Sequence, residues 1–171
     1  MKHIVRTSCI LFIILINAGC DQISKHIARE NLVYNNYVSV IGKKLVLIKT
    51  ENSGAFLSIG ESMTGTLKFL TLSLIPMATL LFGIYFLIRH THLPRLLVTG
   101  ICFVIGGGLG NLIDRLLYGS VTDFLHMDFY GLKTGIFNLA DVSIMIGMGM
   151  ILINIFFTKN KIRGEVGDTV I

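Results

Sequence analysis

Two aspartates stand at the edges of the last apolar segment of a strongly hydrophobic chain. Asp123 ends the phrase Val121-Thr122-Asp123, and Asp141 ends the phrase Asn138-Leu139-Ala140-Asp141. An ionisable side chain at the edge of a membrane helix is energetically costly, so it marks a functional site by default. Two converging carboxyl groups can share one proton and activate a water molecule for hydrolysis. We therefore place the candidate chemistry at Asp123 and Asp141.

Metal-dependent hydrolysis is an alternative use of the same region. The candidate ligands would be Asp114, Asp123, His126 and Asp141. A metal site there would need these side chains to converge. The other histidines and the three cysteines show no ligand spacing and no CxxC pair. An acid pair acting on water needs no metal and no cofactor, and we expect neither.

Composition identifies an integral membrane protein and excludes an ordinary soluble domain. The 171 residues are 53% hydrophobic and only 15% charged, with a mean hydropathy of +0.73. Soluble domains carry about 25% charged residues. The net charge of +5 then indicates basic loops that set membrane topology, not a nucleic-acid partner. We expect a single domain over residues 1–171.

Four apolar segments predict four transmembrane helices, at about residues 4–23, 69–88, 96–113 and 139–157. A helical span needs about 20 apolar residues. The second and third segments meet this requirement without a charge. The fourth meets it if Asp141 lies at the membrane interface.

The first segment also resembles a secretory signal, because Lys2 and Arg6 precede it and Ala18-Gly19-Cys20 ends it. In that alternative the chain is a lipoprotein precursor modified at Cys20. Asn17 stands where such a signal normally has leucine. Arg6 can also extend toward the interface and lengthen the span to about twenty residues. We therefore predict a retained first helix.

Basic residues predict the orientation. They flank the first span, occupy the short loop at 89–95, and recur in the polar tail at 159–171. The positive-inside rule then places both termini and the short loop in the cytoplasm. The loop at 24–68 and the loop carrying Asp123 fall outside. We expect the tail after Lys159 to be disordered.

The long outer loop, residues 24–68, contains signals for local structure. Residues 24–32 can continue the first helix. Residues 37–48 are rich in β-branched and aromatic side chains around Gly42-Lys43-Lys44, which predicts a hairpin. Asn52-Ser53-Gly54 predicts a turn. We expect a small β element on the outer membrane surface.

Polar residues at the ends of the first and third spans form two further motifs. Asp21 and Lys25 are spaced i,i+4 and can pair, either to fix helix depth or to position substrate. In the third span Asn111 and Arg115 share a helix face beside Asp114, which allows an interfacial Asp–Arg pair. Gly106 and Gly110 form a GxxxG pattern for close helix packing.

The fourth span begins with a comparable arrangement. Asn138 precedes Asp141 by three residues, so the two side chains share a face. Asp141 alone could be a first-turn acid stabilised by the helix dipole. Ser143 and Gly147 extend a small-residue face that can pack on the third span and bring Asp141 toward Asp123. Intramembrane acids also occur in transporters and channels. That alternative predicts acids near mid-membrane, whereas these lie at span ends.

Five motifs occur in an order that resembles the lipoprotein signal peptidase (signal peptidase II) family. They are Asp21-Gln22-x-x-Lys25, Asn52-x-Gly54-Ala55-Phe56, Gly107-x-x-Gly110-Asn111-x-x-Asp114-Arg115, Val121-x-Asp123-Phe124 and Phe137-Asn138-x-Ala140-Asp141. No single motif is specific, but five in this order on four spans are highly specific. The resemblance covers nearly the whole chain.

The resemblance implies a membrane all-α fold of four helices, with the outer loop forming a β-cradle and a short interfacial helix over the substrate. It implies an aspartyl endopeptidase of the bacterial inner membrane with its active site at the outer face. The enzyme would remove signal peptides from diacylglyceryl-modified prolipoproteins by cutting before the lipid-bearing cysteine. Its partners would be these prolipoproteins and membrane lipid, and we expect a monomer.

The resemblance also implies roles for individual residues. Asp123 and Asp141 match the catalytic pair. Positions that bind substrate or support the site are Asp21, Lys25, Asn52, Gly54, Asn111, Arg115, Asn138 and Ala140. Structural positions are Asp114, Gly107 and Gly110. Because Asp21 and Lys25 then belong to the enzyme's own first helix, the resemblance argues against a cleaved signal.

Overall fold

The computed structural model describes residues 2–42, 44–55, 60, 63, 65–129 and 131–167. Within these residues, four helical stretches are long and apolar enough to cross a membrane, which confirms the predicted spans. They are α1 (Lys2–Asn31); α2 (Gly65–Phe69) with η2 (Leu70–Leu74) and α3 (Ile75–Arg89); α4 (Arg95–Tyr118); and α5 (Leu139–Gly167).

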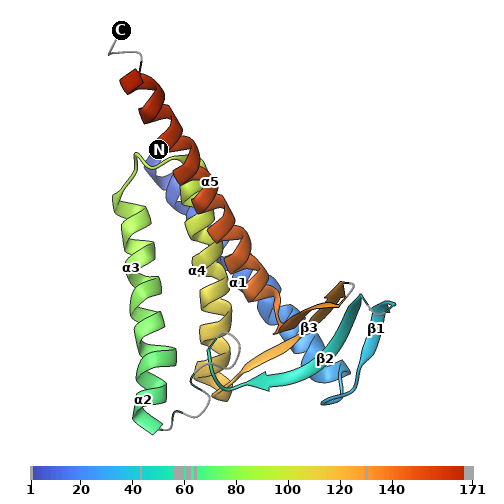
Figure 1. The fold of residues 1–171 in the computed structure, drawn as a ribbon. Coiled ribbons are helices and arrows are strands. Elements are labelled where there is room, and N and C mark those ends of the chain that lie inside the picture. The colour runs from blue at the N-terminus through green and yellow to red at the C-terminus, as the bar shows by residue number, and fades with distance from the viewer. Residues whose placement is uncertain are drawn as a thin grey trace.

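Helix α4 lies at the centre of the bundle (Figure 1) and contacts α1, α3 and α5. Glycines on its different faces allow each neighbour to approach closely. A side chain at Gly106 would lie 3.0 Å from Ile14 O of α1, and one at Gly100 would lie 2.9 Å from Gly147 O of α5. A side chain at Gly108 would lie 2.7 Å from a leucine of α3. This is the packing that the small-residue spacing predicts.

The apolar run at 69–88 suggested one regular helix, but the second span is not regular. The five residues of η2 form a π-helical turn, closed by a hydrogen bond from Ile75 N to Leu70 O. Pro76 follows directly and has no N–H to donate to the carbonyl of Leu72. A widened turn before Pro76 accommodates this interruption. The turn leaves Ser73 buried.

A four-stranded antiparallel sheet lies at one end of the bundle (Figure 1), with the order β1-β2-β3-β4. Its strands are β1 (Val38–Ile41), β2 (Leu45–Asn52), β3 (Val121–Phe129) and β4 (Leu132–Phe137). The predicted hairpin is confirmed, since Ser39 pairs with Val46. The segment around Asp123, expected to be a loop, is instead strand β3. It pairs with β2 through Thr50–Asp123 and Asn52–Val121.

Two helices continue beyond their apolar segments. Helix α1 extends without a break to Asn31, which confirms the predicted helical continuation after residue 24. Helix α5 extends to Gly167, so the prediction of a disordered tail after Lys159 is wrong over that part of the chain. No proline interrupts these polar residues, and the helix continues through them. The rest of the tail, 168–171, lies outside the described residues, as do Lys43 and Phe56.

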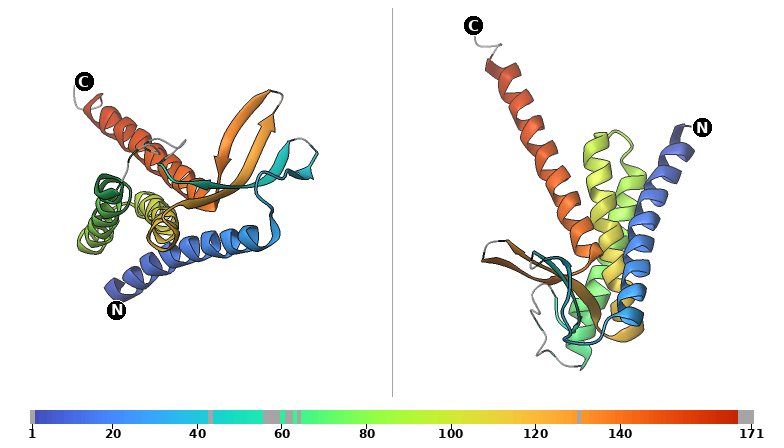
Figure 2. Two further views of the ribbon diagram at one scale, coloured as in Figure 1. Left: turned by 90° about the horizontal axis from the view of Figure 1, so that it is seen from below. Right: turned by 90° about the vertical axis from the view of Figure 1, so that its right-hand side faces the viewer.

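The start of α1, the end of α5 and the short connection between α3 and α4 lie at the end of the bundle opposite the sheet (Figure 2). Which end faces the cytoplasm stays a prediction. Arg6 of α1 reinforces the end opposite the sheet, because its guanidinium donates to Leu87 O at 2.8 Å and to His90 O at 3.0 Å. These bonds satisfy carbonyls that the end of α3 leaves free.

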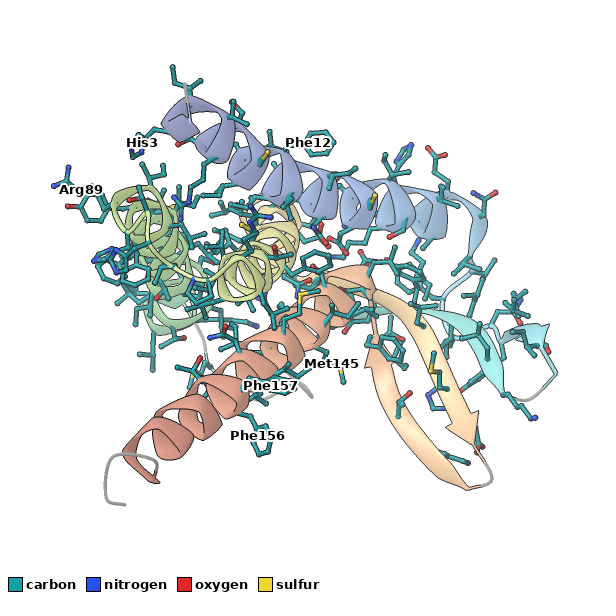
Figure 3. All side chains as sticks on the ribbon, turned by 90° about the horizontal axis from the view of Figure 1, so that it is seen from above. His3, Phe12, Arg89, Met145, Phe156 and Phe157 are labelled. Carbon is teal, nitrogen blue, oxygen red and sulfur yellow. The ribbon has the colours of Figure 1, made fainter. Side chains whose placement is uncertain are left out.

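Large apolar side chains cover the outward faces of α1 and α5 (Figure 3). The labelled examples are Phe12, Met145, Phe156 and Phe157, each more than 60% exposed. They point away from the neighbouring helices. A bundle with such an exterior is suited to lipid and not to water.

Candidate active site

The two predicted acids, Asp123 on β3 and Asp141 on α5, meet at the side chain of Asn138. Asn138 Nδ2 donates to Asp123 Oδ1 over 2.6 Å, and the Asn138 backbone N–H donates to Asp141 Oδ2 at 3.2 Å. Asp123 is only 4% exposed, whereas Asp141 is half-buried. The two acids therefore belong to one hydrogen-bonded cluster.

Helix α5 positions Asp141 through a reciprocal cap. Asn138 precedes the helix, and its Oδ1 accepts the backbone N–H of Asp141 at 3.1 Å. Asp141 Oδ2 in turn accepts the backbone N–H of Asn138. This is the geometry of a capping box, with Asn and Asp in place of Ser and Glu. The first-turn role that spacing suggested for Asp141 therefore coexists with its place in the acid cluster.

Asn52, at the end of β2, positions the other acid. Its Nδ2 donates to Asp123 Oδ2 at 3.1 Å, and its Oδ1 accepts the backbone N–H of Gly54 at 3.0 Å. The second bond closes the predicted turn at Asn52-Ser53-Gly54 as an Asx-turn. Because both oxygens of Asp123 accept side-chain amides, from Asn52 and Asn138, its carboxyl plane is fixed.

Asn111 on α4 completes the amide cluster. Its Nδ2 donates to Asp141 Oδ1 at 3.0 Å, while its Oδ1 accepts Asn138 Nδ2 at 3.1 Å. Lys25 Nζ also donates to this Oδ1, at 2.9 Å. Since an ammonium group can only donate, Lys25 dictates which end of the Asn111 amide faces Asp141.

A fully buried charge cluster stands behind Asn111. Lys25 Nζ lies 2.7 Å from Asp21 Oδ2 and 3.3 Å from Asp114 Oδ2, and all three side chains are 0% exposed. The predicted i,i+4 pair of Asp21 and Lys25 is therefore present. Asp21 Oδ1 also accepts the backbone N–H of Ala140 at 2.8 Å, which ties α1 to the start of α5. Paired burial of this kind offsets the cost of removing charges from water.

Asp114 anchors the strand that carries Asp123. Its Oδ2 accepts the backbone N–H of Thr122 at 3.1 Å and lies 2.8 Å from Arg29 Nη2. The Asp114–Arg115 pair that the sequence allowed as an alternative is not formed among the described residues, because on a helix adjacent residues point in different directions. Arg115 instead donates through Nη2 to Gly54 O at 2.8 Å, which brings the turn after β2 to α4.

Two glycines of α4 allow this assembly to close. A side chain at Gly110 would collide with the carboxylate of Asp21, and one at Gly107 would collide with the carbonyl oxygen of Ala140. Only glycine lets α4 approach both the buried charge cluster and the cap of α5. Ala140 itself is 0% exposed.

The four residues of the metal hypothesis do not converge. His126 lies three residues after Asp123 on a strand, so the two side chains point to opposite faces of the sheet. His126 lines a groove with Tyr37 and Ser39. Asp114 is engaged by Lys25, Arg29 and Thr122. Among the described residues, no group of three or more His, Cys, Asp or Glu side chains could hold a metal ion.

Electrostatics distinguish Asp123 from an ordinary surface carboxyl group. Burial and the nearby charge of Asp141 raise the pKa of Asp123 to about 6. Hydrogen bonds from Asn52 and Asn138 oppose this rise but do not cancel it. A carboxyl group in this range can exist protonated or ionised near neutral pH, as acid–base catalysis requires.

Comparison with known proteins identifies the family. A family model described as signal peptidase (SPase) II matches residues 13–157, which include all four predicted spans in whole or in part. The chain belongs to the signal peptidase II family. It is 34% identical to the lipoprotein signal peptidase of Helicobacter acinonychis over 164 residues, covering 94% of this chain and 96% of the relative.

Other relatives match this chain over similar lengths. The lipoprotein signal peptidase of Staphylococcus carnosus is 31% identical, covering 94% of this chain and 98% of the relative. A solved structure described as a bacterial membrane enzyme shares the fold with a TM-score of 0.79 and 28% identity, covering 90% of this chain and 91% of that one. These matches replace the transporter and lipoprotein-precursor hypotheses with a membrane-bound protease.

Several side chains that organise the site were not predicted to belong to it from the sequence. Gln22 Nε2 donates to Asp114 Oδ1 and to Gly110 O, each at 3.0 Å. Arg29 Nε donates to Thr122 Oγ1 at 2.9 Å. Gln22 and Thr122 lie inside quoted motifs and could have been included on that signal. Arg29 has no sequence signal, because its contact depends on β3 lying beside the end of α1.

Proposed function

We propose that Asp123 and Asp141 are the catalytic pair of an aspartic endopeptidase. The chain removes signal peptides from prolipoproteins, and we assign its substrates as the diacylglyceryl-modified forms, cut before the lipid-bearing cysteine. The observation that carries the proposal is the amide cluster, in which Asn138 contacts both acids. In the described part of the chain, no other pair of acids is both partly exposed and held by side-chain amides in this way.

The two acids have different roles in this mechanism. Asp141 receives N–H groups from Asn111 and Asn138 at the start of α5, where the helix dipole favours negative charge. We assign Asp141 as the general base. The raised pKa of Asp123, about 6, favours its protonated form, and we assign it as the general acid.

Hydrolysis then proceeds in two proton-balanced steps. Asp141 takes a proton from water as the water oxygen bonds to the scissile carbonyl carbon, and Asp123 gives its proton to the carbonyl oxygen. On collapse the C–N bond breaks, the leaving nitrogen takes the proton from Asp141, and the hydroxyl proton returns to Asp123. The pair ends in its starting protonation state, and neither step requires a covalent enzyme intermediate.

The surrounding residues fix this geometry. Asn52, Asn111 and Asn138 hold the carboxyl planes of the two acids, and Lys25 orients Asn111. Asp21, Asp114, Ala140 and the glycines at 107 and 110 form the rigid support behind them. Arg115 and Gly54 are joined to each other and, through Asn52, to Asp123, and we assign them to binding the peptide backbone of the substrate. Held side chains of this kind reduce the reorganisation needed in the transition state.

The proposed membrane orientation places the sheet and the acid pair at the outer face of the bacterial inner membrane. Both termini and the α3–α4 connection then lie in the cytoplasm, and a monomer is sufficient because one chain supplies the whole cluster. In a cysteine-free background, Lys133→Cys in intact spheroplasts should react with a membrane-impermeant maleimide, and His92→Cys should not. The reverse pattern would contradict this orientation.

The substrate assignment can be tested with the purified full-length enzyme in detergent. A diacylglyceryl-modified prolipoprotein and its unmodified form are incubated separately, and mass spectrometry identifies each new amino terminus. We expect one cut, before the lipidated cysteine, and only in the modified substrate. Equal cleavage of the unmodified form, or a cut at another bond, would contradict the assignment.

A further inference from the structure

A cavity of about 190 Å³ lies between the start of the second span and the sheet end of α4. Lys68, Ser73 and Arg115 supply its polar lining, and Phe69 and Leu72 supply apolar walls. It borders the acid cluster through Arg115, whereas Lys68 and Ser73 have no role in the proposed proteolysis. Two cationic side chains facing one small cavity identify it as a candidate anion site.

Arg115 lines this cavity and carries one unsatisfied donor. Its Nη2 donates to Gly54 O at 2.8 Å. Its Nε is buried and has no hydrogen-bond acceptor among the described residues. Because a buried N–H without a partner is unfavourable, an acceptor that a ligand supplies would be favoured there.

Lys68 and Ser73 stand across the cavity on the second span. Lys68 is half-buried, and its ammonium group forms no salt bridge with any carboxylate in the described part of the chain. Ser73 is 5% exposed and belongs to the π-helical turn η2. Widened turns of this kind often occur at functional sites. Together with Arg115, these two side chains provide an ammonium group, a hydroxyl group and a guanidinium group as donors.

We propose that this cavity binds the phosphate group of a membrane phospholipid. Arginine and lysine donors form charge-assisted hydrogen bonds with phosphate oxygens, and the combination suits an anion better than a neutral ester. Leu67 and Phe69, beside the cavity, are 56% and 52% exposed and offer an apolar path for an acyl chain. That path favours a lipid over free inorganic phosphate. A bound headgroup would link the second span to α4.

Native mass spectrometry of the full-length protein in neutral detergent can measure this binding directly, without any proteolysis. Phosphatidylglycerol and diacylglycerol with identical acyl chains, the second lacking the phosphate group, are titrated into wild type, Lys68→Gln and Ser73→Ala. Lys133→Gln, a change at an exposed lysine of β4, is the matched charge control. Sodium phosphate is titrated as the headgroup-free probe.

The proposal predicts that phosphatidylglycerol binds wild type more tightly than diacylglycerol, which has no phosphate group, does. Lys68→Gln should weaken phosphatidylglycerol binding about tenfold, while Lys133→Gln leaves it unchanged. Ser73→Ala should weaken it to a smaller extent. Equal binding of the two lipids, or equal effects of Lys68→Gln and Lys133→Gln, would overturn the proposal. Displacement of the lipid by millimolar phosphate would assign the cavity to free phosphate instead.

Discussion

The side-chain amide of Asn138 lies 2.6 Å from Oδ1 of Asp123, which joins the strand carrying one acid to the cap of the helix carrying the other. Because the amide of Asn138 also accepts from Asp141 N, a change at this residue affects both acids at once.

Asn138→Ser separates this bridging role from helix capping. Serine retains a side-chain oxygen that can cap α5, but it has no amide to donate to Asp123 or Asn111. We expect kcat to fall about 100-fold, because the two acids lose their fixed relation. Asn138→Ala should lose the same activity and, in addition, about 1 kcal/mol of stability from the missing cap. Activity assays and thermal unfolding in detergent measure the two effects, and wild-type kcat in Asn138→Ser would refute the bridging role.

The pH dependence of cleavage follows from the raised pKa of Asp123. Because that carboxyl group must be protonated to donate, kcat/KM should fall as the pH rises through about 6, where Asp123 loses its proton. A pH–rate profile of the detergent-solubilised enzyme between pH 4.5 and 8.5 tests this. A flat profile over that range would show that Asp123 is not the general acid.

Stability supplies an independent check on the same group. A carboxyl group whose pKa is higher in the folded state than in the unfolded state binds more protons when folded. The contribution of Asp123 to wild-type stability should therefore fall as pH rises from about 4 to about 6, over the interval between the two pKa values. The Tm of Asp123→Asn relative to wild type should increase across the same interval. A constant difference would argue against a raised pKa.

Removal of the buried lysine should be strongly destabilising. Lys25→Met leaves Asp21 and Asp114 buried at 0% exposure with their shared cation gone. Breaking a buried ion pair from one side costs about 3–5 kcal/mol. Lys133→Met removes only an exposed pair at 3.9 Å and should change stability by less than about 1 kcal/mol. Thermal unfolding would refute a structural role for Lys25 if the two variants behaved alike.

Close approach of α4 and α5 can be tested with a pair of glycines. Gly107→Ala would force a methyl group against the Ala140 carbonyl and to 2.9 Å from Ile144 Cγ1. Overpacking of this kind costs about 1–3 kcal/mol, and the displaced helix start should also lower activity. Gly149→Ala, on α5, meets nothing within 4 Å and should leave activity intact. Equal loss of activity in both variants would contradict a specific packing role for Gly107.

Much of the fold could be predicted because the spans are determined by local composition. Twenty apolar residues make a span whatever lies beside them, and the i,i+4 spacing of Asp21 and Lys25 is fixed by helix geometry. Strand β3 could not be predicted in the same way. Its partner β2 lies about seventy residues earlier, and the second and third spans stand between Asn52 and Val121 in the chain.

The site shows the same division between local and long-range information. The reciprocal cap of Asn138 and Asp141 follows from their spacing of three residues. The pair of Asp114 and Arg115 that the sequence allowed is replaced by one between Asp114 and Arg29, which lies on another helix. The sequence shows which residues belong to the site more readily than it shows which of them are in contact.

The central claim is that Asp123 and Asp141 together hydrolyse the substrate without a metal ion. Purified wild type, Asp123→Asn and Asp141→Asn are assayed on a diacylglyceryl-modified prolipoprotein, with and without EDTA, after unfolding curves confirm that each variant is folded. The account predicts that wild type cleaves equally well in EDTA and that neither variant cleaves. Loss of wild-type cleavage in EDTA, or full activity in either folded variant, would contradict it.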